Sequence, residues 1–229
     1  MPYKVIHTIL DLLFPVRCLG CRKANAHICP SCLLHMQRKN SECFFCGVKI
    51  NKSVLNNICS QCIRKSPLSG IWWPWHYQNE TTKKVITAYK YRRKKWLAPA
   101  LSAYIKNAMD MGLLPSDSII IPVPLSQSRQ VERGFNQAEL LADNLPFEIL
   151  RSVAIKVKDT PQQARTHSKN ERIDHMRDAF LIKNPSAILG RTILLVDDVA
   201  TTGATLCELA KTLKNAGSGL VYAAVLAHG

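Results

Sequence analysis

The segment ILLVDDVATTGAT, residues 193–205, decides the fold of this chain. Its first four residues are apolar, which is typical of a strand buried on both faces of a parallel sheet. Two carboxylates follow, and then a loop of threonine and glycine residues that ends where a helix begins near Thr205. Because ligands of open α/β sheets bind at the carboxyl ends of the strands, we expect a ligand site at this loop.

The loop has the chemistry to hold a sugar phosphate. Its backbone amides and the start of the helix bind anions, and Gly203 lets a ligand approach the backbone closely. Carboxylates repel phosphate but accept hydrogen bonds from hydroxyl groups, so Asp197 and Asp198 suit the sugar. The alternative is that both aspartates only cap the next helix. The candidate binding residues are Asp197, Asp198, Val199, Ala200, Thr201, Thr202, Gly203, Ala204 and Thr205.

A second anion site is predicted in residues 119–139, IIIPVPLSQSRQVERGFNQAE. An apolar strand again leads into a loop, with Arg129 and Arg133 beside it. Guanidinium groups match pairs of phosphate oxygens, so both arginines are candidates for holding a pyrophosphate. Arg133 is also a candidate catalytic residue, together with Asp197 and Asp198. The alternative is a solvated basic start of a helix.

Residues 67–229 alternate between apolar runs and helical patterns, which indicates an α/β domain with a mostly parallel sheet flanked by helices. Pro74 places the first strand at an edge or a bulge. Residues 158–178 are polar and are expected to form a lid over the strand ends. Cys207 is expected to be a buried helix residue. The expected strands span residues 71–77, 118–123, 152–157, 193–196 and 220–227, and the expected helices span residues 82–91, 97–111, 127–143 and 205–215.

Eight of the nine cysteines form four Cys-x-x-Cys pairs before residue 63. Two such pairs supply four thiolates, which bind one Zn²⁺ tetrahedrally and leave no open position, so two structural zinc ions are expected. A disulfide framework would suit an exported chain. An iron–sulfur cluster is chemically possible, but the paired spacing favours zinc. The expected ligands are Cys18, Cys21, Cys29, Cys32, Cys43, Cys46, Cys59 and Cys62.

We favour a sequential pairing of these knuckles, with the first two pairs on one zinc ion and the last two on the other, over an interleaved pairing. The gaps of 7 and 12 residues inside the two sites suffice for short hairpins. Residues 1–66 are thus predicted to be a double zinc-ribbon module with a short leading helix, followed by the α/β domain in residues 67–229. A module this small depends on its metals for stability.

The formal net charge of +15 indicates an anionic partner, such as nucleic acid or a phosphorylated metabolite. Cationic and aromatic side chains gather in one stretch, a combination that suits single-stranded nucleic acid. The alternative is that the tryptophans pack in a core and the cations are solvated. The stretch contains Trp72, Trp73, Trp75, Tyr77, Lys83, Lys84, Lys90, Tyr91, Arg92, Arg93, Lys94, Lys95 and Trp96.

The start of the chain has a short apolar stretch that Asp11 interrupts and that no small-residue cleavage site follows. No run of 18 or more uncharged apolar residues occurs. We therefore expect a cytoplasmic protein without a transmembrane helix.

The segment 193–205 resembles the motif that binds 5-phosphoribosyl-1-pyrophosphate (PRPP) in type I phosphoribosyltransferases. The resemblance implies that Asp197 and Asp198 hold the ribose hydroxyls, that the loop holds the 5′-phosphate and that Mg²⁺ accompanies PRPP. The order of the motifs YKYRR, PVPLSQSRQVERGFNQAELLA, TPQQARTHSKNER and VDDVATTGAT, after four Cys-x-x-Cys pairs, resembles the ComF competence family along nearly the whole chain. This resemblance implies a role in natural transformation, with single-stranded DNA and a helicase-like ATPase as partners.

One position departs from the family's pattern. Where such proteins have Arg followed by Asn ahead of an Ala-Phe pair, this chain has Arg172 and then Asp174 and His175. The lid contact that this asparagine makes is therefore missing from the pattern. His167 and His175 are the two histidines with a candidate role in the lid.

Three functions fit these residues. The first is a phosphoribosyltransferase that acts in DNA uptake, with a lid residue such as Arg165 or Lys169 assisting. The second is a non-catalytic adaptor that binds PRPP or DNA and docks the ATPase through its zinc module. The third is a nucleotide-salvage phosphoribosyltransferase. Variable loops recognise the acceptor, so the motifs do not separate the three.

Overall fold

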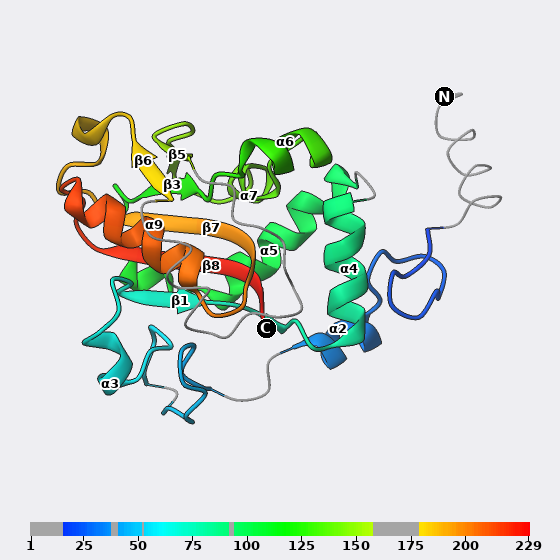
Figure 1. Ribbon diagram of the computed structural model, residues 1–229. Helices are drawn as coiled ribbons and strands as arrows, with labels where there is room; N and C mark the ends of the chain where they lie inside the picture. The colour runs from blue at the N-terminus through cyan, green and yellow to red at the C-terminus, as the bar shows by residue number, and fades with distance from the viewer. Residues whose placement is uncertain (1–15, 38–40, 52, 92–93, 158–178) are drawn as a thin grey trace, which may run out of the picture.

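The structure is a computed structural model that describes residues 16–37, 41–51, 53–91, 94–157 and 179–229. Figure 1 shows a central sheet with helices on both faces and two cysteine-rich segments at separate places on its border. The expected leading helix and the lid at residues 158–178, with His167 and His175, lie outside the described residues. The predicted boundary at residue 66 also stays a prediction.

The main sheet has six strands, and every pairing in it is parallel. Its order is β1-β8-β7-β3-β4, and β2 also pairs with β8. A separate antiparallel pair is formed by β5 and β6. The strands are β1 (Gly70–Trp72), β2 (Trp75–His76), β3 (Ile119–Pro122), β4 (Glu148–Ile149), β5 (Ala154–Lys156), β6 (Phe180–Ile182), β7 (Ile193–Ala200) and β8 (Val221–His228). The predicted parallel α/β fold is confirmed.

The helices connect these parallel strands and cover the two faces of the sheet (Figure 1). The helices are α2 (Pro30–Met36), α3 (Ser60–Ile63), α4 (Glu80–Tyr91), α5 (Ala98–Ala108), α6 (Gln127–Arg133), α7 (Gln137–Ala142) and α9 (Ala204–Asn215). Short 3-10 turns span Lys95–Leu97, Met111–Leu113 and Pro185–Ile188. Among the described helices, none is long and apolar enough to cross a membrane.

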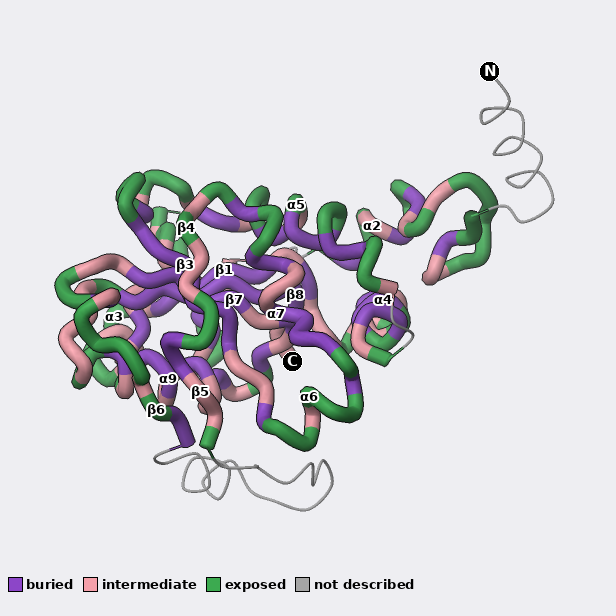
Figure 2. Tube along the Cα trace, turned by 90° about the horizontal axis from the view of Figure 1, so that it is seen from above, coloured by how far each residue is buried: buried purple, intermediate pink, exposed green. Residues whose placement is uncertain are grey.

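Alternation along the strands divides the core into two clusters. Ile193 and Leu195 of β7 pack on the face covered by α9, whereas Leu194 and Val196 pack on the face covered by α4, α5 and α7. Successive side chains of a strand point to opposite faces, so a strand apolar at every position supplies both clusters. Figure 2 shows β7 and β8 buried along most of their length. Burial of each such side chain contributes about 1.5–3 kcal/mol.

Two predicted elements are interrupted in the structure. The strand expected at residues 71–77 consists of β1 and β2, and Pro74 lies between them, because proline cannot donate to a strand ladder. The helix expected at residues 127–143 consists of α6 and α7. Gly134 ends α6 with a φ of 72°, and the Asn136 side chain caps α7 by accepting a hydrogen bond from the Ala138 amide at 3.0 Å.

Candidate ligand site and metal centres

The cysteines form two groups of four, in which the ligand atoms lie within 4.8 Å of one another. The first group is Cys18, Cys21, Cys29 and Cys32, and the second is Cys43, Cys46, Cys59 and Cys62. The Sγ atoms of Cys21 and Cys29 are 3.6 Å apart, and those of Cys46 and Cys59 are 3.8 Å apart. A tetrahedral zinc ion with Zn–S bonds of about 2.3 Å requires about 3.8 Å. The sequential pairing is confirmed, and both groups fit Zn²⁺.

Backbone amides lower the pKa of one thiol in each zinc site. Burial alone would raise the pKa of Cys18, but amide donors from Cys29, Cys21 and Gly20 lower it to about 6. The amide of Cys62 lowers the pKa of Cys59 to about 7. Zinc binds the thiolate, so these amides favour the form that the metal needs. This effect does not extend to every ligand, because burial raises the pKa of Cys32 and that of Cys62 to about 12. Burial likewise raises the pKa of Cys207 to about 12, but Cys207 has no cysteine partners around it among the described residues.

The phosphate loop runs from the end of β7 into α9. The strand is longer than predicted and includes Asp197 and Asp198, and the helix begins at Ala204. Gly203 precedes the helix with a φ of 75°, a left-handed conformation that favours glycine. Thr201 is exposed and Thr202 is half-buried, so both hydroxyls lie near the surface. Amides at the start of a helix favour anions, so this loop and the start of the 12-residue helix α9 are the candidate anion site.

A phenylalanine from the second ribbon lies directly against this loop. A Cβ atom at Gly203 would be 2.6 Å from Cε1 of Phe44, so the phenyl ring occupies the space that any other residue would need. Phe44 is 2% exposed and packs edge-on against Trp73, with ring centroids 5.4 Å apart. The second zinc site thereby supports the phosphate loop.

The acidic pair at the end of β7 meets two cations. Nζ of Lys90 lies 2.8 Å from Oδ1 of Asp198, and NH1 of Arg133 lies 3.9 Å from Oδ2. The side chains of Asp198 and Arg133 are both 6% exposed. A buried carboxylate needs such partners to stay ionised. Asp198 is therefore held from inside the protein, and Asp197 is the more accessible member of the pair.

Asp197 has an unusual acidity. Burial and the neighbouring charge of Asp198 raise its pKa to about 7, against the opposing effect of Lys90. Its Oδ1 accepts a hydrogen bond from the Asp198 amide at 2.8 Å. A carboxylate that titrates near neutral pH at the end of a central strand is typical of a functional site. Asp197 can accept hydrogen bonds from a sugar hydroxyl when it is ionised.

The two arginines of the second predicted anion site differ in burial, because Arg133 is buried and Arg129 is half-buried. Arg133 donates from NH1 to Oε1 of Gln137 at 2.9 Å, and its guanidinium lies over the Tyr91 ring. Buried Nε of Arg133 and Nε2 of Gln137 have no hydrogen-bond partner among the described residues. Arg129 is half-buried one turn earlier in α6. The structure thus brings Arg133, but not Arg129, to the acidic pair.

The stretch of cations and aromatics separates into buried and exposed parts. Trp72, Trp73 and Trp75 are at most 2% exposed, so for them the packing interpretation is right and the DNA interpretation is wrong. Lys90 is likewise committed to Asp198 rather than to solvent. Tyr91 and Trp96 are 46% and 49% exposed. We call Tyr91, Lys94, Lys95 and Trp96 the α4-end surface.

Sequence reasoning missed the roles of Lys90 and Phe44. Lys90 lies within YKYRR, where one lysine in a basic run carries no sign that it is buried. Phe44 lies between two zinc ligands, where an aromatic residue has no separate meaning. Both act through contacts between distant parts of the chain.

Together, the parallel sheet, the acidic pair before a phosphate loop and the two four-cysteine sites define a phosphoribosyltransferase-like protein with a double zinc ribbon. The phosphoribosyl transferase domain family matches residues 131–229, and the double zinc ribbon domain family matches residues 9–68.

Relatives extend the match over most of the chain. Competence protein F of Haemophilus influenzae is 30% identical over 89% of this chain and 93% of its own length. DNA utilization protein YhgH of Escherichia coli K12 is 30% identical over 92% and 96%, and competence protein ComFC of Bacillus subtilis is 30% identical over 87% and 78%. The chain belongs to the ComF family.

Proposed function

We propose that this chain binds PRPP with Mg²⁺ at the end of β7 and uses this site in handling incoming single-stranded DNA during natural competence, in the cytoplasm. The observation that carries the proposal is the acidic pair, with Asp198 fixed by Lys90 at 2.8 Å and Asp197 left to the ligand beside the phosphate loop. Relatives named as competence and DNA utilization proteins support the biological setting.

Each part of PRPP has a partner in this arrangement. Asp197 accepts hydrogen bonds from the ribose hydroxyls, and the amides at the start of α9 hold the 5′-phosphate. Buried, unpartnered Nε of Arg133 is a donor for the pyrophosphate side. Mg²⁺ binds through one or two carboxylates together with substrate phosphates, so the half-buried carboxylate of Asp197 suits an ion that arrives with PRPP.

The same residues define what turnover would require. The bond between the anomeric carbon and the pyrophosphate oxygen breaks, and a nucleophile of the acceptor forms the new bond. Negative charge develops on the leaving pyrophosphate, where Arg133 and Mg²⁺ would stabilise it. Asp197 and Asp198 would keep the ribose in place while the bond changes. The candidate catalytic residues are therefore Asp197, Asp198 and Arg133.

The α4-end surface is the proposed path for single-stranded DNA. Trp96 presents half of its surface and is paired with the His27 ring, with centroids 4.0 Å apart. Nζ of Lys94 lies 5.4 Å from the Trp96 ring centroid. Exposed rings stack on bases while lysines follow the phosphates. Because Tyr91 also contacts Arg133, this surface adjoins the acidic pair. The zinc ribbons are the proposed docking site for a helicase-like ATPase.

Calorimetric titration with PRPP, with and without Mg²⁺, tests the ligand site. The wild type should bind PRPP only with Mg²⁺, and the double variant Asp197→Asn with Asp198→Asn should not bind. Asp117→Asn, an exposed aspartate, is the matched control and should bind normally. Circular dichroism establishes whether each variant is folded. Equal PRPP affinity in a folded double variant would overturn the site.

Pyrophosphate release identifies the acceptor. The protein is incubated with PRPP, Mg²⁺ and single-stranded DNA, or with free nucleobases in place of DNA. Release with DNA above the level of the double variant supports transfer in DNA handling, and release with a nucleobase alone supports salvage. PRPP binding without release identifies a binding module.

Fluorescence anisotropy with labelled single-stranded DNA tests the α4-end surface. Trp96→Ala should lose about 1–3 kcal/mol of binding free energy, the usual contribution of one stacked base. Lys94→Ala should reduce the dependence of affinity on salt. Lys106→Ala, an exposed lysine on α5, is the control. Unchanged affinity in Trp96→Ala would remove this surface from the proposal.

A further inference from the structure

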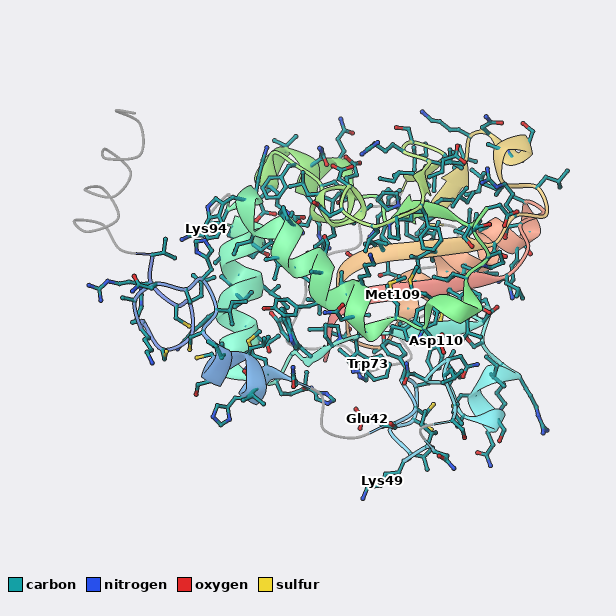
Figure 3. The ribbon with its side chains drawn as sticks, turned by 180° about the vertical axis from the view of Figure 1, so that it is seen from behind. Glu42, Lys49, Trp73, Lys94, Met109 and Asp110 are labelled. Carbon is teal, nitrogen blue, oxygen red and sulfur yellow. The ribbon has the colours of Figure 1, made fainter. Side chains whose placement is uncertain are left out.

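Three metal-ligating side chains outside the cysteine sites meet where the second ribbon crosses the edge of the sheet. Glu42, His76 and His228 each offer one ligand atom, and these atoms lie within 4.8 Å of one another. Nε2 of His76 is 3.6 Å from Oε1 of Glu42. All three residues are half-buried. Figure 3 shows Glu42 between Trp73, beside the sheet, and Lys49 on the outer end of the ribbon.

The sheet register accounts for the two histidines. His76 is the last residue of β2 and pairs with His228 on the parallel strand β8. Paired residues of neighbouring strands point to the same face with backbones about 5 Å apart, which allows both imidazoles to reach one ion. The Tyr77 amide donates to the His228 carbonyl at 2.6 Å, and the Gly229 amide donates to Ala200 at 3.0 Å. The end of β8 is therefore fixed.

The zinc ribbon supplies the carboxylate. Gln37 forms an isolated bridge with Trp75, so the chain leaving α2 passes β2 one residue before His76. Glu42 then forms a bridge with Lys49 and immediately precedes the zinc ligand Cys43. Its backbone is thereby held within the second ribbon. Three separate segments converge on one point.

Aromatic rings enclose one side of this cluster. The His228 ring lies 4.3 Å from the Phe44 ring and 5.1 Å from the Trp73 ring, measured between centroids. Both of these neighbours are 2% exposed. An apolar wall restricts the motion of the imidazole and limits water on that side, which favours a preorganised ligand set. The other side is open enough to leave all three ligands half-buried.

We propose that Glu42, His76 and His228 bind a divalent first-row metal ion such as Zn²⁺, separately from the two four-cysteine sites. Two imidazoles and one carboxylate suit Zn²⁺ and similar ions, and such a triad leaves coordination positions open. The 3.6 Å separation of His76 and Glu42 is too long for a direct hydrogen bond but is suitable for two ligands of a shared ion. The ion joins the second ribbon to β2 and β8.

The site borders the proposed PRPP site but does not depend on it. His228 pairs with Ala200, the last residue of β7 before the phosphate loop. Phe44, which contacts His228, also fills the space beside Gly203. Metal binding should therefore hold the phosphate loop and the second ribbon together. This metal-mediated connection would form whether or not the loop binds PRPP.

Metal analysis of untagged full-length protein after equilibration with Zn²⁺ and removal of free ion tests the site. The wild type should retain one more equivalent of Zn²⁺ than His228→Ala or Glu42→Gln. His35→Ala is the matched control, because His35 is an exposed histidine outside the cluster, and it should retain the wild-type content. The same zinc content in the wild type and in both folded cluster variants would overturn the proposal.

A competition titration against a zinc chelator measures the affinity of this third site. Loss of either ligand should weaken it by at least about 10-fold, the lower bound for losing even an outer partner of a metal site. If both variants misfold, the wild type still provides a test. Addition of Zn²⁺ to ¹³C-histidine-labelled protein, from which the chelator has removed the most weakly bound zinc, should shift the His76 and His228 resonances but not that of His35. Unshifted cluster resonances would also overturn the proposal.

Discussion

The two zinc ribbons use the same four-thiolate chemistry but attach to opposite parts of the molecule. Cys18, Cys29 and Cys32 of the first ribbon form a small cluster of their own. Its connections to the sheet include Met36 of α2, which packs in the core on the α4 and α5 face, and the bridge between Gln37 and Trp75. The second ribbon instead contributes Cys43 and Phe44 to the core on the α9 face, next to the phosphate loop.

Because the two ribbons contact different parts of the protein, we expect them to affect ligand binding differently. The first ribbon lies against α4, where a Cβ at Gly20 would be 2.7 Å from Thr81. The second ribbon touches Gly203, which is part of the candidate site itself. Both ribbons can therefore stabilise the protein, but only the second has a direct contact with the loop among the described residues. Within the described part of the chain, the first ribbon can affect the site only indirectly, because it contacts α4 and Lys90 of α4 contacts Asp198.

Removing one zinc site at a time gives the largest expected effect. Cys43→Ser should release the second zinc ion and weaken PRPP binding by at least about 10-fold, because structural zinc contributes on the order of 10 kcal/mol of folding energy. Cys18→Ser should release the first ion but change PRPP affinity by less than about 3-fold, since distant sites act nearly independently. Zinc content and calorimetry measure both. Equal losses of PRPP affinity would contradict the comparison.

Core truncations test the same contrast without removing metal. Phe44→Ala should cost about 3–5 kcal/mol of unfolding free energy and Met36→Ala about 2–5 kcal/mol, the usual range for buried side chains. Only Phe44→Ala should also weaken PRPP binding, because it leaves a space beside Gly203. Urea unfolding and calorimetry provide the two measurements. Loss of PRPP affinity in Met36→Ala, in a fraction that remains folded, would remove the distinction.

Lys90 of α4 tests the indirect connection between the first ribbon and the acidic pair. Lys90→Met should destabilise the protein by about 3–5 kcal/mol, because it leaves the buried carboxylate of Asp198 with only the more distant Arg133. Lys83→Met is the matched control on the same helix. Lys83 pairs with exposed Glu80, and its loss should not measurably change the unfolding midpoint. Similar destabilisation by both variants would show that the pairing of Lys90 with Asp198 contributes no more to stability than an exposed ion pair.

The features that the sequence predicted correctly depend on local spacing or period. The knuckle pairing follows from two thiolates per tight turn, and the parallel sheet follows from continuous apolar runs, such as the first four residues of β7. The split of the predicted helix at residues 127–143 also had a local signal. Gly134 and Asn136 are typical helix-ending and helix-capping residues, and the continuous apolar pattern hid them.

The remaining features depend on distant partners that no local pattern specifies. Lys90 of α4 pairs with Asp198 of β7, and Phe44 contacts Gly203, which is far along the chain. In sequence, Lys90 is one cation in a basic run and Phe44 is one aromatic in a knuckle. Trp72, Trp73 and Trp75 were ambiguous for the same reason, because composition does not distinguish a stacking surface from a core.

The pH dependence of stability should show the smallest of the predicted effects, and it tests the ionisation of Asp197 directly. The pKa of Asp197 is about 7 in the folded protein, against an ordinary value of 3.8. Between pH 3.8 and about 7, Asp197 holds a proton in the folded state but not in the unfolded state. The stability that Asp197 contributes therefore falls as the pH rises towards about 7. Asp197→Asn should remove the contribution. At about pH 8 it should therefore be more stable than the wild type, by on the order of 1–3 kcal/mol.

Unfolding of both proteins between about pH 6 and 8, where the zinc thiolates remain deprotonated, provides the measurement. Histidines titrate in the same range, so the informative quantity is the difference between Asp197→Asn and the wild type, with Asp117→Asn as the control. A difference that does not change with pH would mean that Asp197 ionises normally. The difference should persist in a Cys18→Ser background and shrink in Cys43→Ser, because only the second ribbon supports the loop that follows the acidic pair.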